Sequence, residues 1–128
     1  MTRKKFEKLV SEAIKTLPIS ILKKLKNVAI VIEDLPSEYQ LKNLGYYSKN
    51  SLLGLYEGTP QIQRGNYNRV MPDKISLFQK NIEAISKNDC ETIRMVIRDT
   101  LWHEIGHHFG MTEEEVQRFI NTKFHQNI

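Results

Sequence analysis

The longest stretch of helical periodicity in the chain lies between residues 88 and 110. Apolar residues recur there at intervals of three and four, at Ile93, Val96, Ile97, Leu101 and Ile105. This spacing places them on one face of an α-helix, and that face has to pack against the rest of the chain. Asn88 or Asp89 suits the N-cap, and Gly110 suits the C-terminal end. The sequence therefore predicts one long helix that is buried along one side.

Three segments before this helix are predicted to be β-strands: residues 28–32, 52–58 and 75–79. The first is a run of valine, alanine and isoleucine, which is typical of a strand buried on both faces. The second contains Gly54, and a glycine inside a strand indicates a bulge or a close backbone approach. In the third, Ile75 and Leu77 alternate with polar residues, as in a strand with one apolar face.

Helices are also predicted near both ends of the chain. The first has apolar positions at helical spacing and ends near Pro18, with Phe6, Leu9, Val10, Ala13, Ile14 and Leu17 on one face. Thr112 and Glu115 match a capping box that opens a last helix through Val116, Phe119 and Ile120. Residues 36–51 form a long connection with room for a short helical turn, and residues 61–73 form a loop. This order predicts an α+β domain whose small sheet is covered on one side.

Length and composition exclude several classes of protein. The 128 residues fit a single domain over 1–128, and 40% hydrophobic with 27% charged residues suits a soluble globular chain. No apolar run approaches the roughly 20 residues that span a bilayer, and Glu7, Glu12 and Lys15 interrupt any apolar leader. We therefore expect a cytoplasmic protein with no membrane partner.

Charge and cysteine content narrow the choice of ligands. The formal net charge of +4 is modest, and no nucleic-acid-binding motif accompanies it, so we do not expect nucleic acid as a partner. Cys90 is the only cysteine in the sequence. It cannot form an internal disulfide, and a cysteine cluster cannot hold a metal here.

The predicted long helix contains the pattern H-E-x-x-H, formed by His103, Glu104 and His107. Two histidines four residues apart project from the same side of a helix, so their imidazoles can bind one Zn²⁺ ion. Glu104 lies beside the first histidine, where a general base could reach a water molecule on the metal. Histidines that only pack in the core or face solvent would give the same pattern by chance. The position of the motif in a strong helix after a set of strands favours the metal site.

A catalytic zinc site needs a third protein ligand and keeps its fourth position for water. Glu113 lies six residues after His107, and a turn at Gly110 would return the chain toward the metal. We therefore predict Glu113 as the third ligand, although an acidic residue in the first turn of a helix is favourable without binding anything. His108 and His125 are the competing candidates. His108 projects away from the line of the two motif histidines, and His125 lies near the end of the sequence.

Several segments carry more extended sequence patterns. They read LWHEIGHHFG at residues 101–110, LGLYEGTP at 53–60, RG at 64–65 and PDKISLF at 72–78. Together with residues 28–36, these segments resemble the small bacterial minimal zincin family of metallopeptidases. The resemblance implies a compact α+β zincin-like fold, with a small mixed sheet packed against the N-terminal helix and the active-site helix and with a C-terminal helix after them. It also implies that two histidines and an acidic residue hold the metal. That family usually has aspartate at the third position, and Glu113 is one methylene longer.

The resemblance also suggests where a substrate would lie. Zincins hold an extended peptide against an edge strand beside the active-site helix, and Gly54, Leu55, Tyr56 and Glu57 could play that part here. These residues could equally be packed strand residues. A phenol that stabilises the oxyanion could come from one of four tyrosines, Tyr46, Tyr47, Tyr56 and Tyr67.

Two functions follow as hypotheses. The first is a zinc-dependent metallopeptidase that hydrolyses peptide bonds of a peptide or protein substrate by a metal-activated water, with Glu104 as the general base. The second is a catalytically weak or inactive zincin-fold metal-binding protein with a binding or regulatory role. An intact Glu104 favours the first, and the small surface of a 128-residue chain favours the second. The sequence makes no prediction of the oligomeric state.

Overall fold

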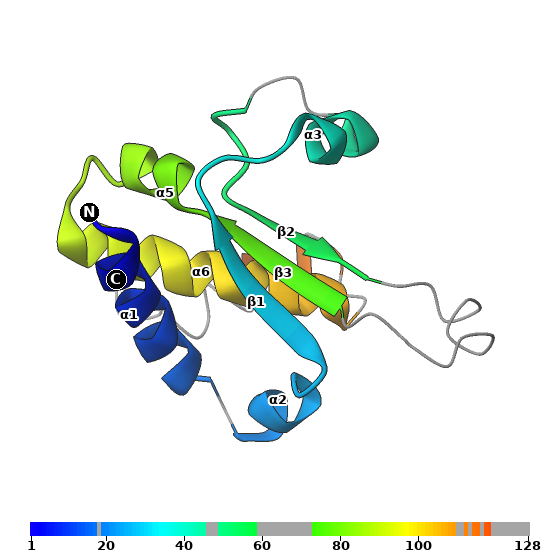
Figure 1. Ribbon diagram of the computed structural model, residues 1–128. Coiled ribbons are helices and arrows are strands. Elements are labelled where there is room, and N and C mark those ends of the chain that lie inside the picture. Colours follow the sequence, from blue (N-terminus) through cyan, green and yellow to red (C-terminus); the bar gives the residue numbers. More distant parts are fainter. Residues whose placement is uncertain are drawn as a thin grey trace.

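The computed structural model describes residues 1–17, 19–45, 49–58, 73–109, 112, 114–115 and 117–118. Its helices and strands follow one another in the order α1 (Arg3–Lys15), α2 (Ile19–Lys24), β1 (Val28–Glu33), α3 (Glu38–Leu44), β2 (Gly54–Glu57), β3 (Asp73–Phe78), α5 (Gln79–Ile85) and α6 (Cys90–His108) (Figure 1). The predicted α+β class is confirmed.

The three strands form one small mixed sheet with β3 in its centre. On one side β1 runs parallel to β3, with Val28 opposite Asp73. On the other side β2 runs antiparallel to β3, with Gly54 opposite Leu77. The strand that contains Gly54 therefore lies at the edge of the sheet, as the resemblance implied.

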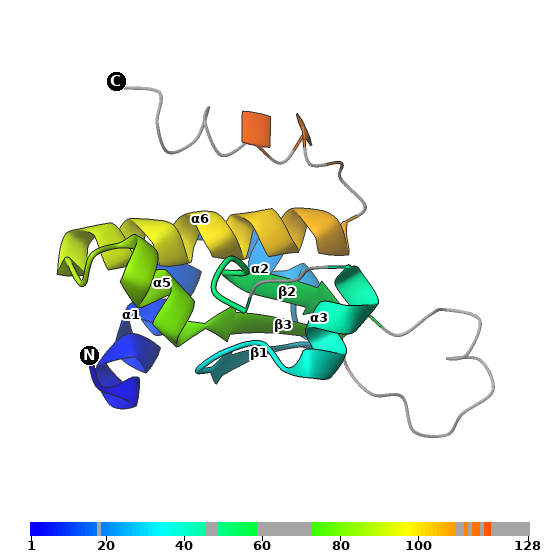
Figure 2. The same cartoon turned by 90° about the horizontal axis from the view of Figure 1, so that it is seen from above.

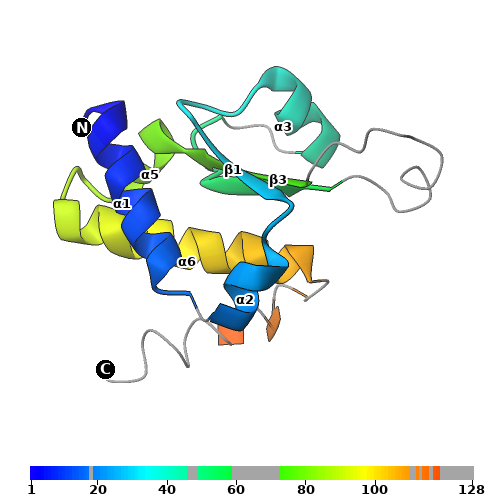
Figure 3. The ribbon, with the colours of Figure 1, turned by 60° about the horizontal axis from the view of Figure 1, so that its bottom comes forward.

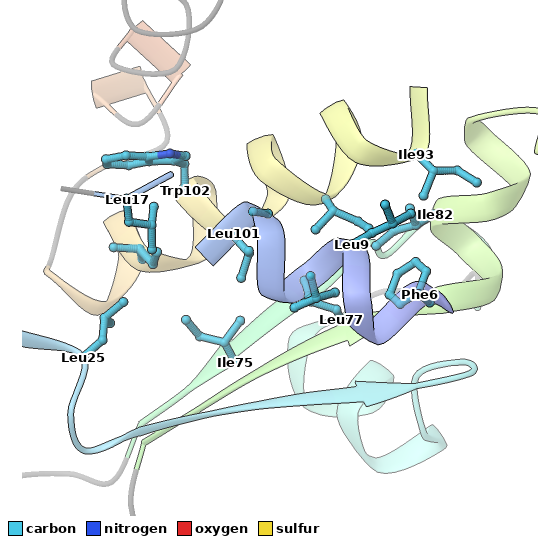
Figure 4. Packing of buried hydrophobic residues seen from close by; sticks show 14 residues of the cluster. Phe6, Leu9, Leu17, Leu25, Ile75, Leu77, Ile82, Ile93, Leu101 and Trp102 are labelled. Atoms are coloured by element: carbon cyan, nitrogen blue, oxygen red, sulfur yellow. The ribbon is translucent and has the colours of Figure 1, made fainter. Parts of the chain in front are cut away.

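The main core lies between the sheet and the helices α1 and α6, which cover the same face of the sheet (Figures 2 and 4). Phe6 and Leu9 of α1 pack there with Leu101 and Trp102 of α6. The central strand β3 adds side chains that include Leu77, which is fully buried. The apolar faces predicted for the first helix and for the long helix are therefore the two halves of one core.

The other face of the sheet is partly covered as well, which corrects the predicted one-sided cover. Figure 3 shows α3 on the side of the sheet opposite α1 and α6. Leu41 of α3 forms a second, smaller buried cluster with Leu52, Leu55 and Phe78. The helix is longer than the predicted short turn because it begins with a capping box. Gln40 N–H donates to Ser37 Oγ at 3.1 Å, and Ser37 N–H donates to Gln40 Oε1 at 2.9 Å.

The predicted burial of two strands is also corrected. Residues 28–33 of β1 are all only partly buried, although the run of valine and isoleucine suggested burial on both faces. The reason is the position of β1 at the outer edge of the sheet. The central strand β3, expected to have one apolar face, is buried almost throughout, and even Ser76 is fully buried.

The ends of several elements differ from the sequence prediction. Gln79, predicted as the last residue of a strand, is the first residue of α5, which follows β3 directly. The short helix α2 was not predicted. The long helix begins after Asp89, whose side chain accepts a hydrogen bond from Thr92 N–H at 3.0 Å, and its last residue is His108. Gly110, the predicted end, lies outside the described residues, as do Val116, Phe119 and Ile120.

The predicted capping box near the C-terminus is confirmed. Glu115 N–H donates to Thr112 Oγ1 at 3.2 Å, and Thr112 N–H donates back to Glu115 Oε1 at 3.2 Å. The hydrogen bond from Thr112 N–H and a second one from the Thr112 hydroxyl at 3.0 Å lower the pKa of the Glu115 carboxyl below its usual value, since both stabilise the charged form. In the part of the chain that the structure describes, no helix combines the length and apolar character needed to cross a membrane.

Candidate active site

The long helix α6 brings the two motif histidines together. The rings of His103 and His107 lie with their centroids 4.7 Å apart and their planes tilted by 34°. Both residues are half-buried, and both line the same groove. The predicted placement on one face of the helix is thus confirmed, because residues four apart are neighbours along a helical turn.

Glu104 is held in place by the backbone of the edge strand. Its side chain is only 8% exposed. Oε1 accepts a hydrogen bond from Tyr56 N–H at 2.8 Å, and Oε2 lies 3.7 Å from His103 Nε2. One carboxylate oxygen is therefore anchored to β2, while the other lies beside the histidine pair. A general base needs this kind of fixed orientation.

Gly54 allows the edge strand to come this close to the helix. A methyl group built on Gly54 would lie 2.6 Å from Thr100 Cγ2 and 3.4 Å from Glu104 Cγ. The first separation is shorter than two carbon atoms can tolerate without a shift. The close approach predicted at Gly54 is confirmed, and the neighbour is the helix that carries the motif.

A groove of about 490 Å³ runs along α6 beside the edge strand. It is lined by Leu44, Leu52, Leu53, Gly54, Leu55, Tyr56, Val96, Asp99, Thr100, His103, Glu104, His107 and Gln117. Val96 lies seven residues before His103, which corresponds to about 10 Å along a helix. The groove thus has an apolar end near Val96 and leucines of the 52–55 segment, and a polar end at the histidines.

The four residues predicted to contact a substrate lie on two faces of β2. Gly54 and Tyr56 are on the side of α6, since a methyl group on Gly54 would meet Thr100 and the Tyr56 side chain packs against the main core. Leu55 packs in the smaller cluster on the opposite side. Glu57 does not line the groove; its Oε1 accepts a hydrogen bond from Gln40 at 2.9 Å and lies 3.7 Å from Lys74 Nζ. An added peptide strand would therefore meet mainly the backbone of β2.

Sequence reasoning missed a contact that involves Tyr56, Asp73 and His108. The Tyr56 hydroxyl donates to Asp73 Oδ2 at 2.7 Å, and His108 Nδ1 lies 3.3 Å from the same oxygen. His108 is therefore engaged away from the motif histidines, as predicted from its helical position. The Tyr56 hydroxyl uses its proton in the hydrogen bond to Asp73, so this phenol is not placed to donate to an oxyanion. No periodic pattern marked Asp73, since its partners are distant in sequence.

The remaining predicted site residues lie outside the described residues. They are Glu113, His125, Tyr46, Tyr47 and Tyr67. Within the described ranges, no group of three or more histidine, cysteine, aspartate or glutamate side chains is arranged to hold a metal. The donor set that is described suits Zn²⁺, because it consists of two adjacent imidazoles with a fixed carboxylate beside them.

Comparison with known proteins agrees with this chemistry. The sequence model of a family described as zincin-like metallopeptidase matches residues 25–121, which is about three quarters of the chain. The matched region includes all three strands, the edge strand with Gly54, and the whole of α6. No curated protein matches the chain.

Proposed function

The chain belongs to the zincin-like metallopeptidase family, and on that premise we propose that it is a zinc-dependent peptidase in which His103 and His107 hold the metal and Glu104 is the general base. The substrate in this proposal is a peptide or a protein. Glu113 is proposed as the third ligand, because it follows His107 at the spacing at which related zinc sites place theirs.

The observation that carries this proposal is the position of Glu104. A buried carboxylate is costly unless its oxygens are hydrogen-bonded or oriented by charge. Here Oε1 is bound by Tyr56 N–H, and Oε2 lies 3.7 Å from His103 Nε2. A carboxylate that is fixed beside a pair of histidines in this way is placed as the general base of a metal-activated water needs to be.

The residues have distinct parts in the proposed hydrolysis. Bound Zn²⁺ supplies Lewis acidity, which polarises a substrate carbonyl and lowers the pKa of a water molecule toward about 7. Glu104 takes a proton from the attacking water at Oε2 and then gives it to the leaving amine. Tyr56 N–H keeps the carboxylate from rotating during these transfers.

The groove beside β2 supports an extended peptide as the substrate. β2 is an edge strand, so backbone groups on its outer side can pair with a further strand, apart from Tyr56 N–H, which binds Glu104. The groove continues from the histidines toward leucine side chains, and Asp99 lies between them on α6. A library of peptides with large apolar residues next to the cleaved bond is therefore the first set of substrates to test.

Metal binding is tested by the zinc content of purified variants. We expect the wild type to retain about one equivalent of zinc, as a mononuclear site requires. His103→Ala and Glu113→Ala are expected to lose most of it. Glu114→Ala is the matched control, since it removes a neighbouring exposed carboxylate that pairs with Arg118 at 3.4 Å. Full zinc in Glu113→Ala would exclude Glu113 as a ligand, and no zinc in the wild type would refute the metal site.

Catalysis is tested by Glu104→Gln on the apolar peptide library. The glutamine oxygen can still accept the hydrogen bond from Tyr56 N–H, so the fold and the zinc content should not change. Loss of a general base is expected to lower the hydrolysis rate by about 100-fold or more. Equal absence of hydrolysis in the wild type and the variant, with zinc retained in both, would contradict the peptidase proposal and support a metal-binding protein with a regulatory role.

A further inference from the structure

Tyr56, Asp73 and His108 form a polar cluster that has no part in the proton transfers described above. The Tyr56 hydroxyl donates to Asp73 Oδ2 at 2.7 Å. His108 Nδ1 lies 3.3 Å from that oxygen and 3.2 Å from the Tyr56 hydroxyl. The rings of Tyr56 and His108 also meet edge to face, with centroids 5.3 Å apart. Each of the three residues therefore contacts the other two.

The carboxylate at the centre of the cluster is buried, and Tyr56 and His108 beside it are partly buried. The side chain of Asp73 is 6% exposed and that of His108 is 18% exposed. The backbone of Gly58 lies so close to the phenol that a methyl group there would be 2.3 Å from the Tyr56 hydroxyl oxygen. A carboxylate in such surroundings needs its hydrogen-bond donors, because water cannot replace them at low cost.

The three residues come from three different elements of the site. Tyr56 is in the edge strand, Asp73 begins the central strand, and His108 is the last residue of α6. His108 directly follows the motif residue His107. Tyr56 also holds Glu104 through its backbone N–H at 2.8 Å. One residue thus contacts both the general base and the helical turn that carries a histidine of the motif.

We propose that Tyr56 is a positioning residue, whose hydroxyl, through Asp73 and His108, fixes the last turn of α6 against the edge strand and so orients His107 and Glu104. A helix end is otherwise prone to fray, because its last carbonyl groups have no partners within the helix. The inference rests on the proposed metal site, since its readout is the affinity of that site for zinc.

Tyr56→Phe is the variant that tests this inference. Phenylalanine keeps the ring against His108 and the backbone N–H to Glu104, and it removes only the hydroxyl that Asp73 binds. The protein is stripped of metal and then titrated with Zn²⁺ in competition with a coloured chelator of known affinity. We expect the zinc affinity to fall by about tenfold or more, which is the size of effect found when groups that orient metal ligands are removed.

Tyr39→Phe is the matched control, because Tyr39 is 73% exposed on α3. The zinc affinity of the Tyr39→Phe protein should equal that of the wild type. The visible absorption spectrum of the Co²⁺-loaded protein gives a second readout, and we expect it to change in Tyr56→Phe alone. A lower melting temperature with unchanged zinc affinity and an unchanged Co²⁺ spectrum would mean that the cluster only stabilises the fold, which would overturn the proposal.

Two measurements keep the inference testable if Tyr56→Phe does not fold. His108→Gln leaves the Tyr56–Asp73 hydrogen bond in place and should weaken zinc binding in the same way. In the wild type, coupling between two sites is reciprocal, so zinc is expected to slow the exchange of the Tyr56 hydroxyl proton, which is hydrogen-bonded to Asp73. Unchanged exchange on zinc binding would refute the proposal. Failure of the wild type to bind zinc would instead refute the proposed function, so the two failures are distinguishable.

Discussion

At the scale of single residues, Gly54 decides how closely the edge strand approaches the helix that carries the histidines. Its missing side chain leaves room for Thr100 Cγ2, which an added methyl group would meet at 2.6 Å. The same closeness lets Tyr56 N–H reach Glu104 at 2.8 Å. The orientation of Glu104 therefore depends on a residue that has no side chain of its own.

Gly54→Ala is expected to destabilise the protein by about 1–3 kcal/mol, the usual cost of overpacking a well-packed site. The free energy of unfolding is measured by urea denaturation. Thr100→Ser removes the methyl group that clashes, so the double variant should recover part of the loss, and a double-mutant cycle isolates that interaction. Strictly additive effects of the two substitutions would show that the contact with Thr100 is not the cause.

At the scale of elements, the N-terminus of α6 is fixed by the charged cap residue Asp89. Asp89 Oδ2 accepts hydrogen bonds from the Thr92 hydroxyl at 2.7 Å and from Thr92 N–H at 3.0 Å. These bonds hold the pKa of the Asp89 carboxyl below its usual value of 3.8. Because the folded state lowers this pKa, the carboxylate stabilises the fold at pH values above the usual pKa of the group. This contribution is lost as the pH falls through the folded-state pKa.

Asp89→Asn tests this pH dependence. Asparagine is also a good N-cap, but it has no carboxylate to ionise. We expect the variant to be less stable than the wild type at neutral pH, with the difference shrinking as the pH is lowered below about 4, where an unfolded aspartate becomes protonated. Thermal unfolding of both proteins at several pH values measures this difference in stability. A stability difference that stays constant from neutral to acid pH would contradict a role for the charge.

At the scale of the whole molecule, the sheet is the scaffold between two unequal layers of helix. α1 and α6 cover one face over the main core, and α3 covers part of the other (Figure 3). The guanidinium of Arg3 in α1 donates to the carbonyl of Ile32 at 2.7 Å and pairs with Asp34, so the first helix is tied to the outer strand β1. The histidine helix therefore packs both against the sheet and against α1, which covers the same face of the sheet.

Local sequence patterns were sufficient for the helices that matter most to the site. The apolar spacing of α1 and α6, the Asp89 cap and the placement of His103 and His107 all depend on residues within one or two helical turns of each other. Such contacts are set by helix geometry alone. The burial of the strands was predicted less well, because the same apolar run suits a central strand and an edge strand that leans on a core.

The sequence by itself determined a long helix with two histidines and a glutamate in reach of one another, within a small α+β chain. Only the tertiary structure decided how Glu104 is oriented, since its partner Tyr56 lies 48 residues away in the chain. The same is true of the cluster around Asp73, where Tyr56 and His108 are 52 residues apart. Contacts of this kind leave no periodic trace in a sequence, because they depend on how separate elements pack and not on the geometry of any one of them.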